Sequence, residues 1–151
     1  MTQLGGISER RIMEHGASSD MGAMAAHNAL ARRGMRSEEL DCIIAATVTP
    51  DMFFPCTACL IQEKIGAKNA WGFDLNGACS GFVFALATAD CMLRSGSFKR
   101  ALVIGAETFS RILDWSDRTT CVLFGDGAGA VLIEPSRKYG IIDTLICSDG
   151  A

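Results

Sequence analysis

The feature that most constrains the fold of this chain is an apolar run from Cys42 to Val48, in which six of the seven residues are apolar. The run lacks the period-two alternation of a strand with one solvent-exposed face, and Thr49-Pro50-Asp51 ends it. It therefore predicts a strand that is covered on both faces. Such a strand needs a layer of helices on each side of its sheet.

Helices and further strands supply these layers. Three helices are predicted, each stopped by a glycine: one capped by Ser18 or Ser19 and ending before Gly34, one over 57–64 ending at Gly66, and one over 80–94 closed by Gly96. The third has apolar residues around most of its circumference, so we expect it to be buried on nearly all sides. Strands are predicted over 70–75, 101–105 and 140–147, and over an antiparallel pair, 121–124 and 128–133, joined by Gly125-Asp126-Gly127. This order indicates an α/β layered fold with a mixed sheet, the size of one domain.

Charge and hydropathy exclude several classes of protein. The net charge is -3 and no block of Lys or Arg occurs, so a nucleic-acid-binding protein is not expected. No apolar run approaches the ~18 residues of a membrane span. The first five residues lack the basic and apolar regions of a signal peptide, which predicts a cytoplasmic protein.

The chain has seven cysteines, and most lie inside apolar runs. A reduced cysteine in such a run behaves as a small apolar side chain. The pattern therefore predicts free thiols and not a disulfide framework.

Cys79 differs from the other cysteines in its position. A strand ending in a turn that contains Gly77 places it at the first turn of a long helix, where unpaired backbone N–H groups and the helix dipole favour a negative charge. This environment favours the nucleophilic thiolate, and the same N–H groups can form one side of an oxyanion hole for a thioester carbonyl. Gly77 and Gly81 are expected to leave room for a substrate. The alternative is that Cys79 is one more small core residue.

Four segments carry motifs in a fixed order: Gly6-Ile7-Ser8-Glu9-Arg10-Arg11-Ile12, 74–82, Asp117-Arg118-Thr119-Thr120, and 124–130. In order and spacing they resemble the motifs of the β-ketoacyl-acyl-carrier-protein synthase III family, over essentially all of residues 6–150. The resemblance implies a thiolase-like half-fold, with a layered mixed β-sheet, helices on both faces and a buried nucleophile helix. It also implies that residues 1–151 are an N-terminal thiolase-like domain, truncated at both ends relative to the family and without its C-terminal half.

The resemblance implies an acyltransferase of fatty-acid biosynthesis, in which Cys79 takes an acyl group from acyl-coenzyme A and the thioester condenses with malonyl-acyl-carrier protein. Both are expected partners, together with a second copy of the chain in a homodimer; no permanently bound cofactor or metal is implied. Arg118 matches an arginine that contacts the adenine end of coenzyme A. Phe54 matches a residue that crosses the dimer interface and lines the partner's acyl pocket. Without the resemblance, Arg118 reads as a solvated side chain, and Phe53 and Phe54 as local core.

The chain also departs from the family. The family's second half supplies a His and an Asn that stabilise the enolate formed on decarboxylation. The histidines present here, His15 and His27, lie in no matching motif. We therefore expect the chain by itself to be impaired in condensation, although it can accept an acyl group. The starter acyl chain stays open.

Two other motifs suggest different functions. Cys56-Thr57-Ala58-Cys59 follows a strand and a loop and begins a helix, which is the context of a dithiol redox protein. The run 125–130 fits the dinucleotide fingerprint G-x-G-x-x-A, but a strand is predicted after it where the fingerprint needs a helix. A non-catalytic dimerising half-domain is the remaining alternative.

Overall fold

The sheet at the centre of the molecule has four strands in the order β2-β1-β3-β4. A computed structural model describes residues 6–138 and 140–150. Its strands are β1 (Cys42–Ala46), β2 (Trp71–Leu75), β3 (Ala101–Thr108) and β4 (Asp126–Ile133). β1 pairs in parallel with β2 and β3, whereas β3 and β4 are antiparallel. The predicted mixed sheet is confirmed.

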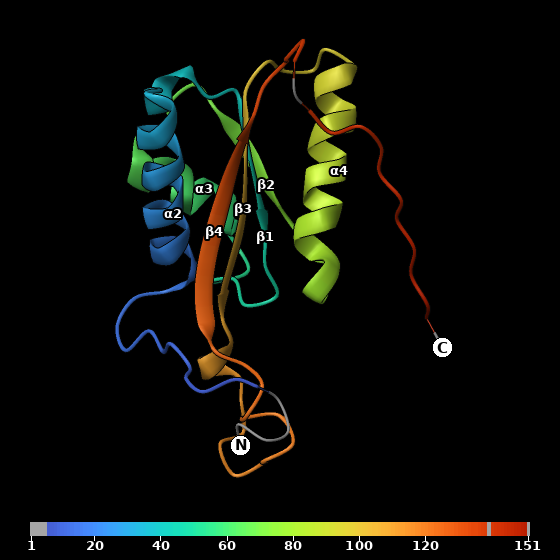
Figure 1. Ribbon diagram of the computed structural model, residues 1–151. Helices are drawn as coiled ribbons and strands as arrows, with labels where there is room; N and C mark the ends of the chain where they lie inside the picture. Colours follow the sequence, from blue (N-terminus) through green and yellow to red (C-terminus); the bar gives the residue numbers. More distant parts are fainter. Residues whose placement is uncertain (1–5, 139, 151) are drawn as a thin grey trace.

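Helices cover both faces of this sheet, as predicted (Figure 1). α2 (Ser18–Arg33) and α3 (Thr57–Ile65) lie on one face and α4 (Gly81–Arg94) lies on the other. All five residues of β1 are buried. Ile43 and Ala45 pack in the cluster under α2 and α3, and the alternate residues of β1 pack toward α4. The strand covered on both faces is therefore present, although it ends two residues earlier than predicted.

The helix ends are partly as predicted. Gly34 and Gly66 follow α2 and α3 with φ of 68° and 70°, a left-handed conformation that glycine adopts without strain. The predicted serine cap of α2 is wrong, because the N-cap residue is Ala17. Ser18 and Ser19 lie inside the helix and are buried. Their hydroxyls donate to the Thr49 carbonyl and the Asp51 carboxylate, in the loop after β1, at 2.7 Å and 2.5 Å, so they hold that loop.

The late strands differ from the prediction. Residues 121–123 form turns, closed by bonds such as Leu123 N–H to the Thr120 carbonyl at 2.9 Å, and residue 124 is irregular, so the segment does not pair with β4. Asp126 and Gly127 belong to β4 itself, which pairs with β3. Residues 140–147 form no strand either, because no strand of the described residues lies alongside them to share hydrogen bonds. Ile142 is accordingly 97% exposed.

α4 was expected to be buried on nearly all sides, and this expectation is wrong for the described part of the chain. Ala85 and Ala89 are buried against the sheet, but Val83 is 50% exposed and Cys91 is also exposed. The physical reason is that no described element packs over the outer face of α4 (Figure 1). Among the residues described, no helix has both the length and the apolar character to cross a bilayer.

Candidate active site

Cys79 lies in a one-turn 3-10 helix, Ala78–Ser80, between β2 and α4. Its side chain is exposed, which overturns the alternative that it is a core residue. Ala78 has φ of 47°, a left-handed conformation that a residue with a Cβ rarely adopts. The N–H of Ser80 donates to the Gly77 carbonyl at 3.1 Å and closes the turn. Cys79 is thus reached by a sharp strand–turn–helix connection, one turn before α4 and not within it.

The two glycines beside Cys79 differ in how tightly they are packed. A Cβ on Gly77 would lie 2.7 Å from Cδ2 of Phe84 and 2.9 Å from Cα of Gly81, so this turn fits against α4 only without a side chain. A Cβ on Gly81 would make an ordinary contact with Ala46 at 3.6 Å. The expectation that Gly77 leaves room for a substrate is therefore wrong, because α4 fills that space.

A small hollow of about 180 Å³ opens beside Cys79. Its lining comes from the end of β1, the turn that holds Cys79, the start of α4, the second half of β3 with the residue after it, and the start of β4: Ala46, Ala78, Cys79, Phe82, Gly105, Ala106, Glu107, Phe109 and Gly127. Most of these residues are apolar or have no side chain. The hollow lies beyond the carboxyl ends of the parallel strands, which is where α/β sheets usually bind ligands. An exposed thiol beside an apolar hollow suits the attack of sulfur on an acyl carbonyl.

Glu107 supports this site, although its only signal in the sequence is a carboxylate near the end of a predicted buried strand. Its Oε1 accepts a hydrogen bond from Val48 N–H at 2.7 Å, and its Oε2 accepts one from Thr49 N–H at 3.1 Å. The hydroxyls of Thr47 and Thr49 also donate to Oε2. One carboxylate therefore ties the loop after β1 to β3 at the wall of the hollow.

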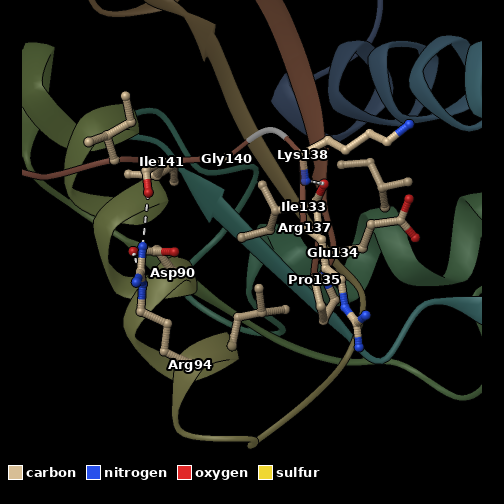
Figure 2. A pocket seen from close by; sticks show the side chains of 13 residues that line it. Asp90, Arg94, Ile133, Glu134, Pro135, Arg137, Lys138, Gly140 and Ile141 are labelled. Carbon is tan, nitrogen blue, oxygen red and sulfur yellow. Dashed lines mark hydrogen bonds and ion pairs between the residues drawn. The ribbon is translucent and has the colours of Figure 1, made fainter.

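A larger hollow of about 910 Å³ lies at the other end of α4 (Figure 2). Its wall runs from α4 to the segment after β4, where Arg94 donates to Asp90 at 2.8 Å and to the Ile141 carbonyl at 2.9 Å. Asp90 and Arg94 are an ordinary i,i+4 ion pair of an exposed helix surface. Cys79 does not line this hollow, so it is not the acyl site.

Phe54 lies in the loop between β1 and α3 and is 84% exposed, and its neighbour Phe53 is 99% exposed. The alternative that these two rings are local core is therefore wrong. Exposed aromatic side chains in a loop are typical of interfaces. The role of Phe54 in a partner subunit stays a prediction.

Arg118 is exposed in the turn 117–120. Asp117 holds this turn, since its Oδ1 accepts hydrogen bonds from the N–H and hydroxyl of Thr119 at 2.9 Å and 2.6 Å. These bonds, with a third from the Thr120 hydroxyl, lower the pKa of Asp117. The described residues offer the Arg118 guanidinium no hydrogen bond or ion pair. Its contact with coenzyme A stays a prediction.

The Cys56 and Cys59 sulfurs are 3.4 Å apart, with Cys56 at the N-cap of α3 and Cys59 in the first turn. Asp74 already occupies this helix end, since its carboxylate accepts hydrogen bonds from Thr57 N–H at 2.7 Å and Ala58 N–H at 2.8 Å. The hydrogen bond with Cys56, burial and the charge of Asp74 raise the pKa of Cys59. In a dithiol redox enzyme only the attacking thiol needs a lowered pKa, and Cys59 would be the second thiol. The dithiol redox role stays a prediction.

Neither histidine lies at the candidate site. His15 and His27 are exposed, and neither lines the hollow beside Cys79. His27 belongs to α2, on the face of the sheet opposite α4 (Figure 1). Over the described residues, no three His, Cys, Asp or Glu side chains form a cluster that could hold a metal ion. Five of the six residues of the glycine run at 125–130 lie within β4, so the predicted turn is absent; as predicted, no helix follows, and the run lacks the geometry of a dinucleotide site.

Comparison with known sequences agrees with the motif order. Residues 73–150 match the model of the family described as 3-oxoacyl-[acyl-carrier-protein (ACP)] synthase III. A β-ketoacyl-[acyl-carrier-protein] synthase III of Clostridium acetobutylicum is 55% identical over 145 residues, which are 96% of this chain and 45% of that protein. The Streptococcus mutans protein of the same name is 50% identical over 151 residues, 100% of this chain and 46% of its own length. The chain spans less than half the length of these relatives.

Solved structures show the same fold. The crystal structure of 3-oxoacyl-[acyl-carrier-protein] synthase III from Aquifex aeolicus VF5 superimposes with a TM-score of 0.88 and 51% identity, covering 90% of this chain and 44% of that one. The priming β-ketosynthase from the R1128 polyketide biosynthetic pathway gives a TM-score of 0.85 with 38% identity, covering 89% of this chain and 40% of that one. The predicted α/β, thiolase-like half-fold is confirmed.

Proposed function

Because this chain belongs to the 3-oxoacyl-[acyl-carrier-protein] synthase III family, we propose that it supplies the acyl-accepting nucleophile, Cys79, of a β-ketoacyl-acyl-carrier-protein synthase of fatty-acid biosynthesis. The observation that carries the proposal is the exposed Cys79 thiol at the mouth of an apolar hollow, beyond the carboxyl ends of β1 and β3. The motif at 74–82, on which the resemblance rests, contains this cysteine. The other exposed cysteines of the described residues, Cys91 and Cys147, line neither of the two hollows described above.

In the proposed first step, the Cys79 thiolate attacks the thioester carbonyl of acyl-coenzyme A. The sulfur–carbon bond to Cys79 forms, the bond to the coenzyme A sulfur breaks, and the coenzyme A thiolate takes up the proton that Cys79 released. The first atoms of the acyl chain would lie against Ala46, Phe82 and Phe109. We expect unpaired backbone N–H groups at the start of α4 to stabilise the carbonyl oxygen as it gains charge.

In the second step, malonyl-acyl-carrier protein loses carbon dioxide and its carbanion attacks the Cys79 thioester, which returns the thiolate. This step needs hydrogen-bond donors for the enolate. His15 and His27 do not lie at the hollow, so we expect the 151-residue chain by itself to perform the first step and not the second.

Two exposed residues complete the proposal. Arg118 contacts the adenine end of coenzyme A, where a guanidinium can stack on the purine and pair with phosphate. Phe54 crosses to a second copy of the chain and lines its acyl pocket. Their exposure supports both assignments, because each side chain is free to meet a ligand or partner.

The test is intact-mass spectrometry of the purified chain after incubation with acetyl-coenzyme A. We expect one acetyl adduct that maps to Cys79, is removed by hydroxylamine, and disappears in Cys79→Ala. Arg118→Ala should need more acetyl-coenzyme A for the same adduct, whereas substitution of Arg36, which is also exposed but lies outside the motifs, by Ala should not. An adduct that persists in Cys79→Ala would refute the nucleophile. A β-ketoacyl product from the chain alone would refute the limit to the first step.

A further inference from the structure

The Cys56–Cys59 pair is left unused by the proposed acyl transfer. Its two sulfurs are 3.4 Å apart, and a disulfide needs about 2.0 Å, so an approach of ~1.4 Å would join them. Cys56 precedes the first helical residue of α3 with an extended backbone, and Cys59 lies in the first turn. The bond can therefore form by side-chain rotation at the helix start, without unwinding α3.

Both thiols are half-buried, so a small reagent can reach them. Cys42 shows the opposite case, since it is fully buried and burial raises its pKa to about 12. Few other groups of the described residues form hydrogen bonds with the Cys56 sulfur. Besides Cys59, the Cys56 sulfur meets only the Gly72 carbonyl, at a long 3.9 Å, among the contacts of the described chain.

We propose that Cys56 and Cys59 form a reversible disulfide by exchange with small-molecule disulfides of the glutathione type. The Cys56 thiolate attacks one sulfur of the small disulfide, which gives a mixed disulfide and releases one small thiol. The Cys59 thiolate then attacks the Cys56 sulfur and releases the second. The two cysteines are oxidised, the small disulfide is reduced to two thiols, and these take up the two protons lost by the protein.

The order of attack follows from the surroundings of Cys59. Its contact with Cys56, its burial and the nearby Asp74 carboxylate all disfavour a negative charge on its sulfur. Cys56 is therefore the first thiol to react and Cys59 the second, resolving thiol. The raised pKa of Cys59 makes the second, resolving attack slower at neutral pH than at higher pH.

The disulfide would tie the start of α3 to the residue that directly follows Phe53-Phe54-Pro55. This loop carries the two most exposed aromatic side chains of the described chain. The bond would close a ring of four residues at the base of the loop and leave the exposed Cys79 thiol unchanged. This site is independent of the proposed acyl transfer, which uses a different sulfur.

The test uses the full chain in a Cys79→Ser background, so that the exposed nucleophile does not compete. After reduction, the chain is incubated with oxidised glutathione, quenched with acid and alkylated with N-ethylmaleimide. We expect the peptide with Cys56 and Cys59 to lose two hydrogens in mass, to carry no alkyl group, and to recover both thiols with dithiothreitol. In Cys59→Ser, Cys56 should stop at the glutathione adduct.

The proposal is overturned if both cysteines remain free, or if both carry glutathione, while other exposed thiols such as Cys91 react. Circular dichroism of reduced Cys56→Ser and Cys59→Ser provides the folding control, because each substitution is nearly isosteric. A disulfide that forms equally in the urea-unfolded chain would also overturn it, since the proposal depends on the geometry of the helix start.

Discussion

The starts of α3 and α4 make an instructive comparison, because each has a cysteine at or just before the first helical turn. At α3 the Asp74 carboxylate accepts the hydrogen bonds of two backbone N–H groups, and the thiols beside it are half-buried. At α4 the turn before the helix holds Cys79 exposed, after Ala78 in a left-handed conformation. The position of a cysteine at a helix start does not by itself decide its chemistry. The chemistry of the cysteine depends on which side chain or ligand accepts hydrogen bonds from the first backbone N–H groups of the helix.

The two helix starts are also joined. Asp74 belongs to β2 and caps α3, and the same strand continues into the turn that carries Cys79. Through Asp74, β2 therefore occupies the backbone N–H groups at the start of α3. Its C-terminal end leads into the turn that presents Cys79 at the start of α4. Substitutions on this strand and turn separate the capping of α3 by Asp74 from the presentation of Cys79 before α4.

The largest effect is expected for Gly77→Ala. The new Cβ would lie 2.9 Å from Cα of Gly81, which is backbone and cannot rotate away. We expect a loss of about 1–3 kcal/mol in the free energy of unfolding, measured by urea denaturation, together with slower alkylation of Cys79 because the start of α4 must shift. Gly127→Ala is the matched control, since Gly127 lines the same hollow and its Cβ would meet nothing within 4 Å. Equal losses in both variants would show that the α4 turn is not specially tight.

A smaller effect is expected for Asp74→Asn. One acceptor oxygen becomes a donor and faces a backbone N–H, which should cost about 1–2 kcal/mol in the free energy of unfolding. Because the charge that helps to raise the pKa of Cys59 is removed, iodoacetamide should label Cys59 faster at neutral pH than in the parent chain. Mass spectrometry of the labelled peptides measures this rate.

Asp41→Asn is the control for that substitution. Asp41 also accepts hydrogen bonds from two backbone N–H groups, those of Lys99 and Arg100, both at 2.9 Å, but it does not cap α3. It should leave the labelling of Cys59 unchanged. If Asp74→Asn also leaves it unchanged, the contrast between the two helix starts does not depend on Asp74.

The smallest effect is expected for Ala78→Gly. Glycine adopts φ of 47° without the steric conflict of a Cβ, so the variant should gain up to about 1 kcal/mol in the free energy of unfolding. Ser80→Gly is the comparison, because Ser80 has φ of -89° and a glycine there only adds freedom to the unfolded chain. A stability gain in Ser80→Gly, or a loss in Ala78→Gly, would contradict the assigned strain.

The sequence predicts the layers of this fold well and its polar contacts poorly. The run 42–48 and the glycines at 34 and 66 depend on local pattern, and the structure confirms them. The runs 121–124 and 140–147 have strand-like composition but no strand partner in the described chain, and pairing is a tertiary property that composition does not contain.

In the candidate site, too, the residue marked by local sequence order was predicted and the residues that act through contacts between elements were not. Cys79 was found because a strand, a Gly turn and a helix follow one another in sequence. Asp74 and Glu107 were missed as supporting residues, because their hydrogen bonds cross from one element to another and span 16 to 17 and 58 to 60 residues. For Glu107 the signal in the sequence is a carboxylate near the end of a buried strand, and for Asp74 it is a place in the motif 74–82 at the end of a half-exposed strand.

The reach of Asp74 also has a consequence for how the chain folds. Its bonds to α3 close loops of 16 and 17 residues, whereas the bond from Met13 N–H to the Asp126 carboxylate joins residues 113 positions apart. The longer closure costs about 1.7 kcal/mol more in chain entropy. We therefore expect α3 and β2 to assemble while the ends of the chain are still open. The segment that presents Cys79 would then be anchored to an early-forming part of the molecule.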